Sequence, residues 1–206
     1  MGFDKYIFRK RGALSQYQCE NIISLFEVAK EKEDNVKKRG YIGHYPLLSA
    51  PEYKFLGDII FKELGEYRKK HSFLGKDRGN FAWSIFPRFH IQKYLPGDSY
   101  SVEHCEHGWS MEDGYETYNR ILGWMIYLND IKKGGGTRWP QQNFTSKPRA
   151  GDLYIWPSAW THSHHGVAAP KEIKYIITGW CNFDPEATKR RNRKLGYGDG
   201  SMLPSD

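Results

Sequence analysis

The sequence predicts an α+β protein in which N-terminal helices cover one face of a β-barrel or a double-sheet jelly roll. Apolar residues recur at helical spacing in the first third of the chain. From about residue 80, short aromatic and β-branched runs alternate with Gly, Pro, Asn and Asp. Helices followed by many antiparallel strands are typical of a sheet core with a helical face.

Two helices are expected before residue 72. In "LSQYQCENIISLFEVAKEKE", Ser15 and Gln18 form a capping-box pattern ahead of apolar residues at helical spacing. A second helix is expected to begin near Pro51, because the missing N–H of proline has no cost in the first turn. Its expected buried face comprises Phe55, Leu56, Ile59, Ile60, Leu64 and Tyr67.

The later segments have the composition of strands. Alternation at period two and enrichment in Tyr, Ile and Trp favour strands in "NFAWSIF", "RFHIQKY", "NRILGWMIYLND", "GDLYIWP" and "IKYIITGWCNF". The segment "NDIKKGGG" is expected to form a glycine-rich hairpin turn. We therefore expect one domain over residues 1–184, with helical support at about 13–72, a jelly roll at about 80–184 and a basic tail at 185–206.

Composition limits the class of protein. A chain of 206 residues with 39% hydrophobic and 27% charged residues is ordinary for one globular domain. No apolar run approaches the roughly 20 residues that span a membrane, and the N-terminus lacks a signal-peptide pattern, so no membrane partner is expected. Three separated cysteines, an odd number, favour a reducing cytoplasmic compartment.

The formal charge of +7 raises the possibility of a nucleic-acid partner. Part of this charge lies in "KRRNRK", residues 189–194, which is typical of a solvated tail. Nucleic acid is therefore not the expected partner. The remaining mild excess of basic residues would suit an anionic cosubstrate. Both a monomer and a homodimer remain open.

Two short segments concentrate metal-binding side chains: "EHCEHGW", residues 103–109, and "THSHHG", residues 161–166. If the first lies on a strand, His104 and Glu106 face one way and Cys105 the other. With one histidine from the second segment they form a two-histidine, one-carboxylate set. That set leaves metal positions open and is associated with non-heme Fe(II) oxygenases, whereas a structural zinc site has none to spare.

The order of further residues extends this pattern. It comprises Tyr94 and Gly97, His104 and Glu106, Tyr127, Leu128 and Asn129, Gly135 and Thr137, and finally His164, Lys174 and Trp180. Over roughly residues 83–183 the chain resembles the prolyl-4-hydroxylase-like branch of the Fe(II)- and 2-oxoglutarate-dependent dioxygenases. The resemblance implies a double-stranded β-helix, or jelly roll. Glu106 departs from the Asp that is commoner in the family.

The resemblance also implies roles for individual residues. Lys174 would pair with the distal carboxylate of 2-oxoglutarate, because a buried ammonium without an anion is costly. The Tyr127 hydroxyl would assist Lys174, Tyr94 would lie beside the cosubstrate, and Trp180 would close the pocket wall. The implied Fe(II) ligands are His104, Glu106 and His164.

The identity of the distal histidine is open. Strand alternation places His162 and His164 on one face and His165 on the other. The family pattern T-H-x-H-R-G and a ten-residue step to Lys174 favour His164. A nine-residue step, found in some relatives, favours His165.

The implied reaction uses Fe(II), 2-oxoglutarate and O2, hydroxylates a C–H bond and releases succinate and CO2. A peptidyl proline is the leading substrate, and other small molecules remain open. Alternatives are a non-catalytic cupin-like binding protein, a zinc hydrolase and a nucleic-acid-binding module. Candidate residues for the outer cleft, most of them equally explained by packing, are Trp83, Trp109, Trp139, Arg88, Arg120 and Arg138.

Overall fold

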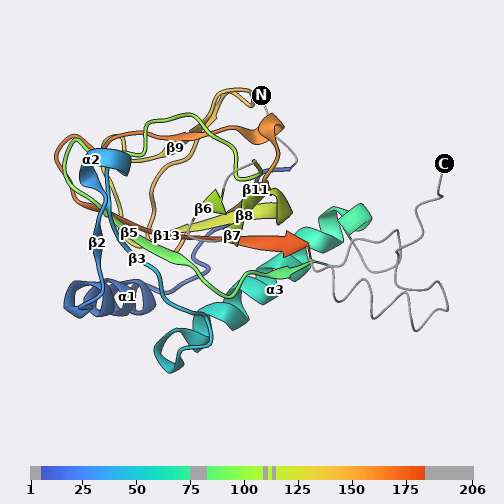
Figure 1. Cartoon of the computed structure of the whole chain (residues 1–206), viewed down its shortest axis with the longest axis horizontal. Coiled ribbons are helices and arrows are strands. Elements are labelled where there is room, and N and C mark those ends of the chain that lie inside the picture. The colour runs from blue at the N-terminus through green and yellow to red at the C-terminus, as the bar shows by residue number, and fades with distance from the viewer. Residues whose placement is uncertain (1–5, 75–82, 109–110, 113–114, 184–206) are drawn as a thin grey trace.

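Figure 1 shows the computed structural model, in which helices α1 and α3 lie on one side of a large sheet and β9 lies on the other. The structure describes residues 6–74, 83–108, 111–112 and 115–183. The expected basic tail at 185–206 and Trp109 lie outside these residues. Within the described part of the chain, no helix combines the length and apolar character needed to cross a membrane.

The strands form two main antiparallel sheets, which confirms the expected jelly-roll core. The large sheet has the order β1 (Phe8–Lys10), β11 (Leu153–Pro157), β8 (Arg120–Tyr127), β13 (Lys174–Phe183), β5 (His90–Tyr94), β3 (Ile42–His44) and β2 (Glu33–Asp34), and β4 (Trp83–Ile85) also pairs with β13. The small sheet has the order β10 (Phe144–Thr145), β9 (Thr137–Trp139) and β12 (His165–Gly166). A separate pair joins β6 (Met111–Glu112) and β7 (Tyr115–Glu116).

Both expected helices are confirmed. Helix α1 (Gln16–Val28) begins after Ser15, whose hydroxyl accepts from the Gln18 backbone N–H while the Gln18 side chain accepts from the Ser15 backbone N–H. A 3-10 turn beginning at Pro51 leads into α3 (Lys54–Lys70). The short α2 (Val36–Arg39) was not expected from the sequence. Further 3-10 turns are Ser72–Leu74, Thr117–Asn119 and Trp160–His162.

Strand alternation divides the interior into two cores. On β8, Trp124 and Ile126 pack in the core that also contains the buried faces of α1 and α3. Met125 and Tyr127 point the other way, into a second, aromatic core between the sheets. The second core also contains Tyr94, Trp139, Tyr154, Trp156 and Ile176. One face of each central strand therefore anchors the helices, and the other lines the inside of the barrel.

The predicted hairpin at "NDIKKGGG" is wrong. Strand β8 belongs to the large sheet, whereas β9 belongs to the small sheet, so the intervening loop crosses between sheets. A Cβ on Gly134 would lie 2.2 Å from the Ala168 carbonyl oxygen, and one on Gly136 would lie 2.1 Å from the Ser146 carbonyl oxygen. These glycines permit close backbone approach rather than a tight reversal.

The condition that the segment around His104 and Glu106 lies on a strand is not met, since no named strand covers residues 99–107. His104 forms an isolated antiparallel bridge with His164, with N···O distances of 3.0 and 2.8 Å. The His107 N–H instead donates to the Ser158 carbonyl at 2.9 Å. The backbone at the candidate ligands is therefore held by one bridge and single hydrogen bonds.

Candidate active site

A cavity of about 280 Å³ lies against the inner faces of the central strands. Strands β5 and β13 pair in register, so alternate residues on each strand face the cavity as cross-strand pairs. These pairs are Lys174 with Tyr94, Ile176 with Gln92, and Thr178 with His90.

Three potential ligands meet in this cavity. One ligand atom from each of His104, Glu106 and His164 lies within 4.8 Å of the other two. The Glu106 Oε1 atom lies 3.2 Å from His164 Nε2. A metal about 2.1 Å from each of two neighbouring ligands holds those ligands about 3.0 Å apart, so this spacing suits a bound metal.

Backbone carbonyls orient both imidazoles. The Nδ1 atom of His104 lies 2.9 Å from the Val102 carbonyl oxygen, and that of His164 lies 3.0 Å from the His162 carbonyl oxygen. A carbonyl only accepts, so each Nδ1 carries the hydrogen. Each Nε2 is then the atom available to a metal, an arrangement common among metal-binding histidines.

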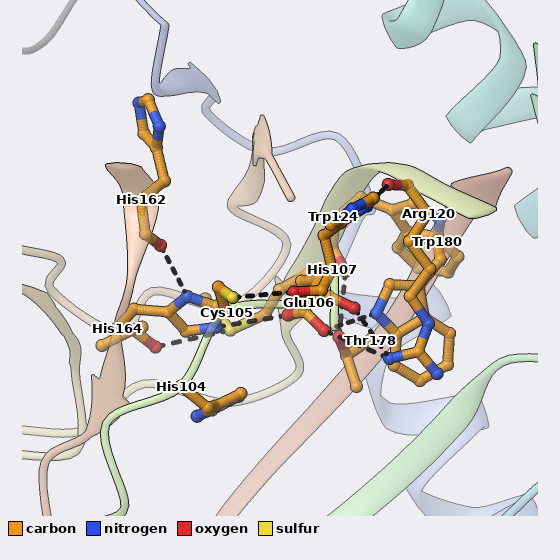
Figure 2. A network of polar contacts seen from close by, with 12 residues as sticks. His104, Cys105, Glu106, His107, Arg120, Trp124, His162, His164, Thr178 and Trp180 are labelled. Carbon is orange, nitrogen blue, oxygen red and sulfur yellow. Dashed lines mark hydrogen bonds and ion pairs between the residues drawn. The ribbon is translucent and has the colours of Figure 1, made fainter. Parts of the chain in front are cut away.

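The Glu106 carboxylate is buried among donors (Figure 2). Its Oε2 atom accepts from the Trp180 indole N–H at 2.6 Å and lies 3.7 Å from an Arg120 guanidinium nitrogen. Burial by itself would raise the pKa of this carboxyl. When the imidazoles are protonated, as they can be without a metal, the hydrogen bond from His164 Nε2–H and the positive charges of His164, His104 and Arg120 outweigh burial and hold the pKa well below its usual range. A metal bound at His164 Nε2 would take the place of that proton.

Lys174 is buried without an acidic partner in the described part of the chain. Its side chain is 3% exposed, and its ammonium lies 4.1 Å from the centre of the Tyr94 ring. Burial lowers its pKa to about 8, and none of the ion pairs between described residues involves it. A buried ammonium that faces a cavity suits an anionic ligand.

The two expected tyrosines differ in position. Tyr94 forms part of the cavity wall, and its hydroxyl donates to Gln92 Oε1 at 2.8 Å. The Tyr127 hydroxyl lies 2.6 Å from Ser146 Oγ and 3.2 Å from Thr137 Oγ1. Thr137 lines the cavity, whereas Tyr127 and Ser146 do not. The help that Tyr127 would give to Lys174 stays a prediction.

The other histidines of the two segments lie apart from the ligand group. His162 points away from Glu106 in Figure 2, and its ring meets the edge of Tyr6 at a centroid distance of 6.2 Å. His165 pairs with Arg138 across β12 and β9. His107 Nδ1 lies 3.3 Å from the Arg120 carbonyl oxygen.

Among the described candidates for the outer cleft, only Arg120 lines the cavity. Trp83 and Trp139 are buried in the two cores, Arg88 donates to the Tyr45 carbonyl, and Arg138 bonds to Asn143 and Thr145.

Several cavity residues were missed from the sequence. His90, Gln92 and Thr178 carry no recognisable motif, although each lies at an even spacing from Tyr94 or Lys174 on the same strand. Alternation along β5 and β13 would have identified them. Burial lowers the pKa of His90 to about 3, with a further contribution from the Arg120 charge, so this imidazole is neutral.

A jelly roll holding a two-histidine, one-carboxylate group, of which Glu106 and His164 are buried, defines a class of mononuclear metal site with open positions. The model of the 2OG-Fe(II) oxygenase superfamily matches residues 89–182, which include all three residues of this group and Lys174. Over this part, which is just under half of its length, the chain is similar to the 2OG-Fe(II) oxygenase superfamily.

A curated relative is similar to part of the chain. "Probable prolyl 4-hydroxylase 9" of Arabidopsis thaliana is 24% identical over an alignment of 129 residues, and the match covers 47% of this chain and 43% of that protein. The match thus spans less than half the length of this curated relative.

Solved structures show the same fold. The viral collagen prolyl hydroxylase of Paramecium Bursaria Chlorella virus-1, in its complex with 2OG, has a TM-score of 0.67 and 18% identity, covering 87% of this chain and 97% of that chain. A Pseudomonas putida prolyl-4-hydroxylase has a TM-score of 0.63 and 18% identity, covering 87% and 93%. A Trichoplax adhaerens prolyl hydroxylase bound to a hypoxia inducible factor peptide fragment has a TM-score of 0.62 and 15% identity, covering 97% and 88%.

Proposed function

We propose that this protein is an Fe(II)- and 2-oxoglutarate-dependent oxygenase that hydroxylates a C–H bond. The observation that carries the proposal is one cavity that contains both the His104, Glu106 and His164 group and a buried lysine with no acidic partner in the described part of the chain. Fe(II) with 2-oxoglutarate and O2 supplies the oxidising chemistry, and the products are a hydroxylated substrate, succinate and CO2.

Each residue has a role in this proposal. His104, Glu106 and His164 hold Fe(II) through two imidazole Nε2 atoms and one carboxylate oxygen, and the distal carboxylate of 2-oxoglutarate pairs with Lys174. The low pKa of Glu106 keeps the carboxylate ionised, as a metal ligand must be.

Between these two ends, apolar side chains in the cavity wall would limit the access of water to the cosubstrate and help to orient it. Tyr94, Met125, Trp156 and Ile176 supply apolar surface there. Apolar surroundings have a low effective dielectric constant. The attraction between Lys174 and a carboxylate is therefore stronger there than it would be in water.

The proposed substrate is a proline residue in a peptide. The relatives described above are prolyl hydroxylases, and the one from Trichoplax adhaerens is bound to a peptide. We place the catalytic domain within residues 1–184 and keep the cytoplasm as the proposed compartment.

The test is a turnover assay on protein purified without oxygen and loaded with Fe(II). Addition of 2-oxoglutarate, O2 and a proline-rich peptide should yield succinate together with a peptide 16 Da heavier. Matched reactions omit iron, cosubstrate or peptide in turn. A cupin-like binding protein would form no succinate above these controls, and a zinc hydrolase would act with Zn(II) in the absence of 2-oxoglutarate.

A further inference from the structure

Gly123 occupies an unusual place for a glycine, since it lies within β8 at the centre of the large sheet. Glycine weakens a strand interior, and its presence there often marks a close approach. A Cβ at this position would lie 3.1 Å from Cγ of Glu106 and 2.9 Å from the Trp156 ring. The missing side chain therefore leaves room for the methylene group that distinguishes glutamate from the commoner aspartate.

The cross-strand partner of Gly123 on β13 is Trp180. Its indole N–H donates to Glu106 Oε2 at 2.6 Å (Figure 2). The indole is itself held in place, because the Arg120 guanidinium lies 3.8 Å from the ring centre and the His90 ring meets it edge-on at 4.7 Å. Trp180 is thus a fixed donor aimed at one carboxylate oxygen.

The two carboxylate oxygens of Glu106 consequently have different surroundings. Oε2 faces Trp180 and Arg120, whereas Oε1 faces His164 Nε2 at 3.2 Å. A glutamate side chain has one more rotatable bond than aspartate, so it loses more conformational freedom when it is fixed as a ligand. Packing against Gly123 and the hydrogen bond from Trp180 hold it in one orientation before a metal arrives.

We propose that Gly123 and Trp180 form a seat matched to glutamate at position 106, which directs Oε1 alone toward the metal. Trp180 is then a positioning residue for the ligand carboxylate, and not only a wall of the cavity. This inference rests on one element of the proposed function, namely that Glu106 binds a metal.

In the experiment, Co(II) replaces Fe(II) and is titrated into the metal-free protein without cosubstrate. Binding is measured by titration calorimetry and by visible absorption spectroscopy. Removal of a group that orients a metal ligand typically weakens binding by about 10-fold to 100-fold, so Trp180→Phe should weaken Co(II) binding by that factor. Its visible Co(II) bands should also shift, because the freed carboxylate binds differently.

A double-mutant cycle tests whether the seat recognises glutamate. In the Glu106→Asp background the shorter side chain cannot reach both Trp180 and the metal, so adding Trp180→Phe should weaken binding less than about threefold further. An equal loss in both backgrounds would overturn the match to glutamate.

Trp124→Phe is the matched control. Trp124 is buried on β8 beside Gly123, its indole N–H has no hydrogen-bond partner among the described residues, and it does not line the cavity. Its Co(II) affinity and spectrum should equal those of the wild type. A loss like that of Trp180→Phe would reduce the proposed role to general packing.

Gly123→Ala tests the room for the methylene group and should also weaken Co(II) binding about 10-fold or more. Its melting curve is recorded, and if it fails to fold the tryptophan variants decide. If Gly123→Ala binds Co(II) as tightly as the wild type, the absence of a side chain at Gly123 is not needed to make room for the Glu106 methylene group.

Failures can be assigned separately. If the wild type binds no Co(II), both the function and the seat are wrong. If it binds Co(II) and Trp180→Phe binds equally well, only the seat is wrong. Absence of succinate with the expected Co(II) results leaves the seat and rejects the oxygenase function.

Discussion

The two ends of the cavity differ in how a buried charge is compensated by its neighbours. At one end Glu106 is surrounded by His164, Trp180 and Arg120. At the other end Lys174 has an aromatic ring beside its ammonium and no acidic partner in the described part of the chain. The pKa of each group follows the same contrast, since Glu106 is held ionised whereas the charged form of Lys174 is disfavoured by burial.

The difference shows which end is complete before ligands bind. The carboxylate end is preassembled, so a metal meets ligands that are already oriented. The lysine end carries a desolvation cost that only an incoming anion offsets. We therefore expect substitutions at the two ends to differ in sign for the stability of the ligand-free protein.

The largest effect is expected at the carboxylate end. His164→Ala should reduce succinate formation to the no-enzyme level, because two remaining ligands hold Fe(II) poorly. His165→Ala is the control and should keep wild-type turnover, since His165 lies outside the ligand group. Turnover with 2-oxoglutarate measures both, and the reverse result would make His165 the distal ligand.

At the lysine end, Lys174→Met should weaken 2-oxoglutarate binding by about 100-fold or more, since a buried charge pair contributes about 2–5 kcal/mol when one partner is removed. Calorimetric titration of 2-oxoglutarate into the Co(II)-loaded protein measures this. Co(II) affinity should be unchanged in the same variant. Equal 2-oxoglutarate affinity in wild type and variant would contradict the assignment.

The same substitution should stabilise the ligand-free protein. The pKa of Lys174 falls from 10.5 to about 8 on folding, so the unfolded chain holds the proton more tightly between these values. The contribution of Lys174 to the free energy of unfolding of the wild type therefore increases as pH rises from about 8 to 10.5. At pH 7 Lys174→Met should be more stable by about 3 kcal/mol, a difference that shrinks toward pH 10.5.

Urea unfolding of both proteins without metal or cosubstrate, between pH 7 and 10, measures the difference directly. Subtracting the two curves removes the contributions of other titrating groups. A wild type that is the more stable protein at pH 7 would show that Lys174 has an internal counter-ion.

The smallest effect concerns Tyr127. Tyr127→Phe removes the hydroxyl that contacts Ser146 and Thr137 and should lower the free energy of unfolding by about 1 kcal/mol. A loss of 2-oxoglutarate affinity well below tenfold is expected as well. A tenfold or larger loss would place this hydroxyl on the cosubstrate beside Lys174 and sharpen the description of that end.

Much of the fold followed from local pattern. The capping box at Ser15, the helix after Pro51 and the five strand segments were predicted because each depends on neighbours in sequence. The glycine-rich loop at 129–136 was wrongly expected to form a hairpin. Its glycines serve contacts with Ala168 and Ser146, and such distant partners leave no local signal.

The spacing of His104, Glu106, His164 and Lys174 was available from the sequence, because the chemistry of a metal ligand or a buried cation restricts the residue type. The contribution of Gly123 was not available, since glycine serves many roles. Arg120 was named only as a candidate for the outer cleft, and His90 was missed although its even spacing from Tyr94 on β5 could have identified it.

The sequence by itself determined the two helices, the strand-rich second half and the side chains that can hold a metal and an anion. Only the tertiary structure decided which histidine joins the group, which donor fixes Glu106, and that Lys174 has no internal acidic partner in the described part of the chain. The physical reason is that residue type and local spacing set chemistry and secondary structure, whereas distances across strands and the exclusion of water arise only when distant segments pack together.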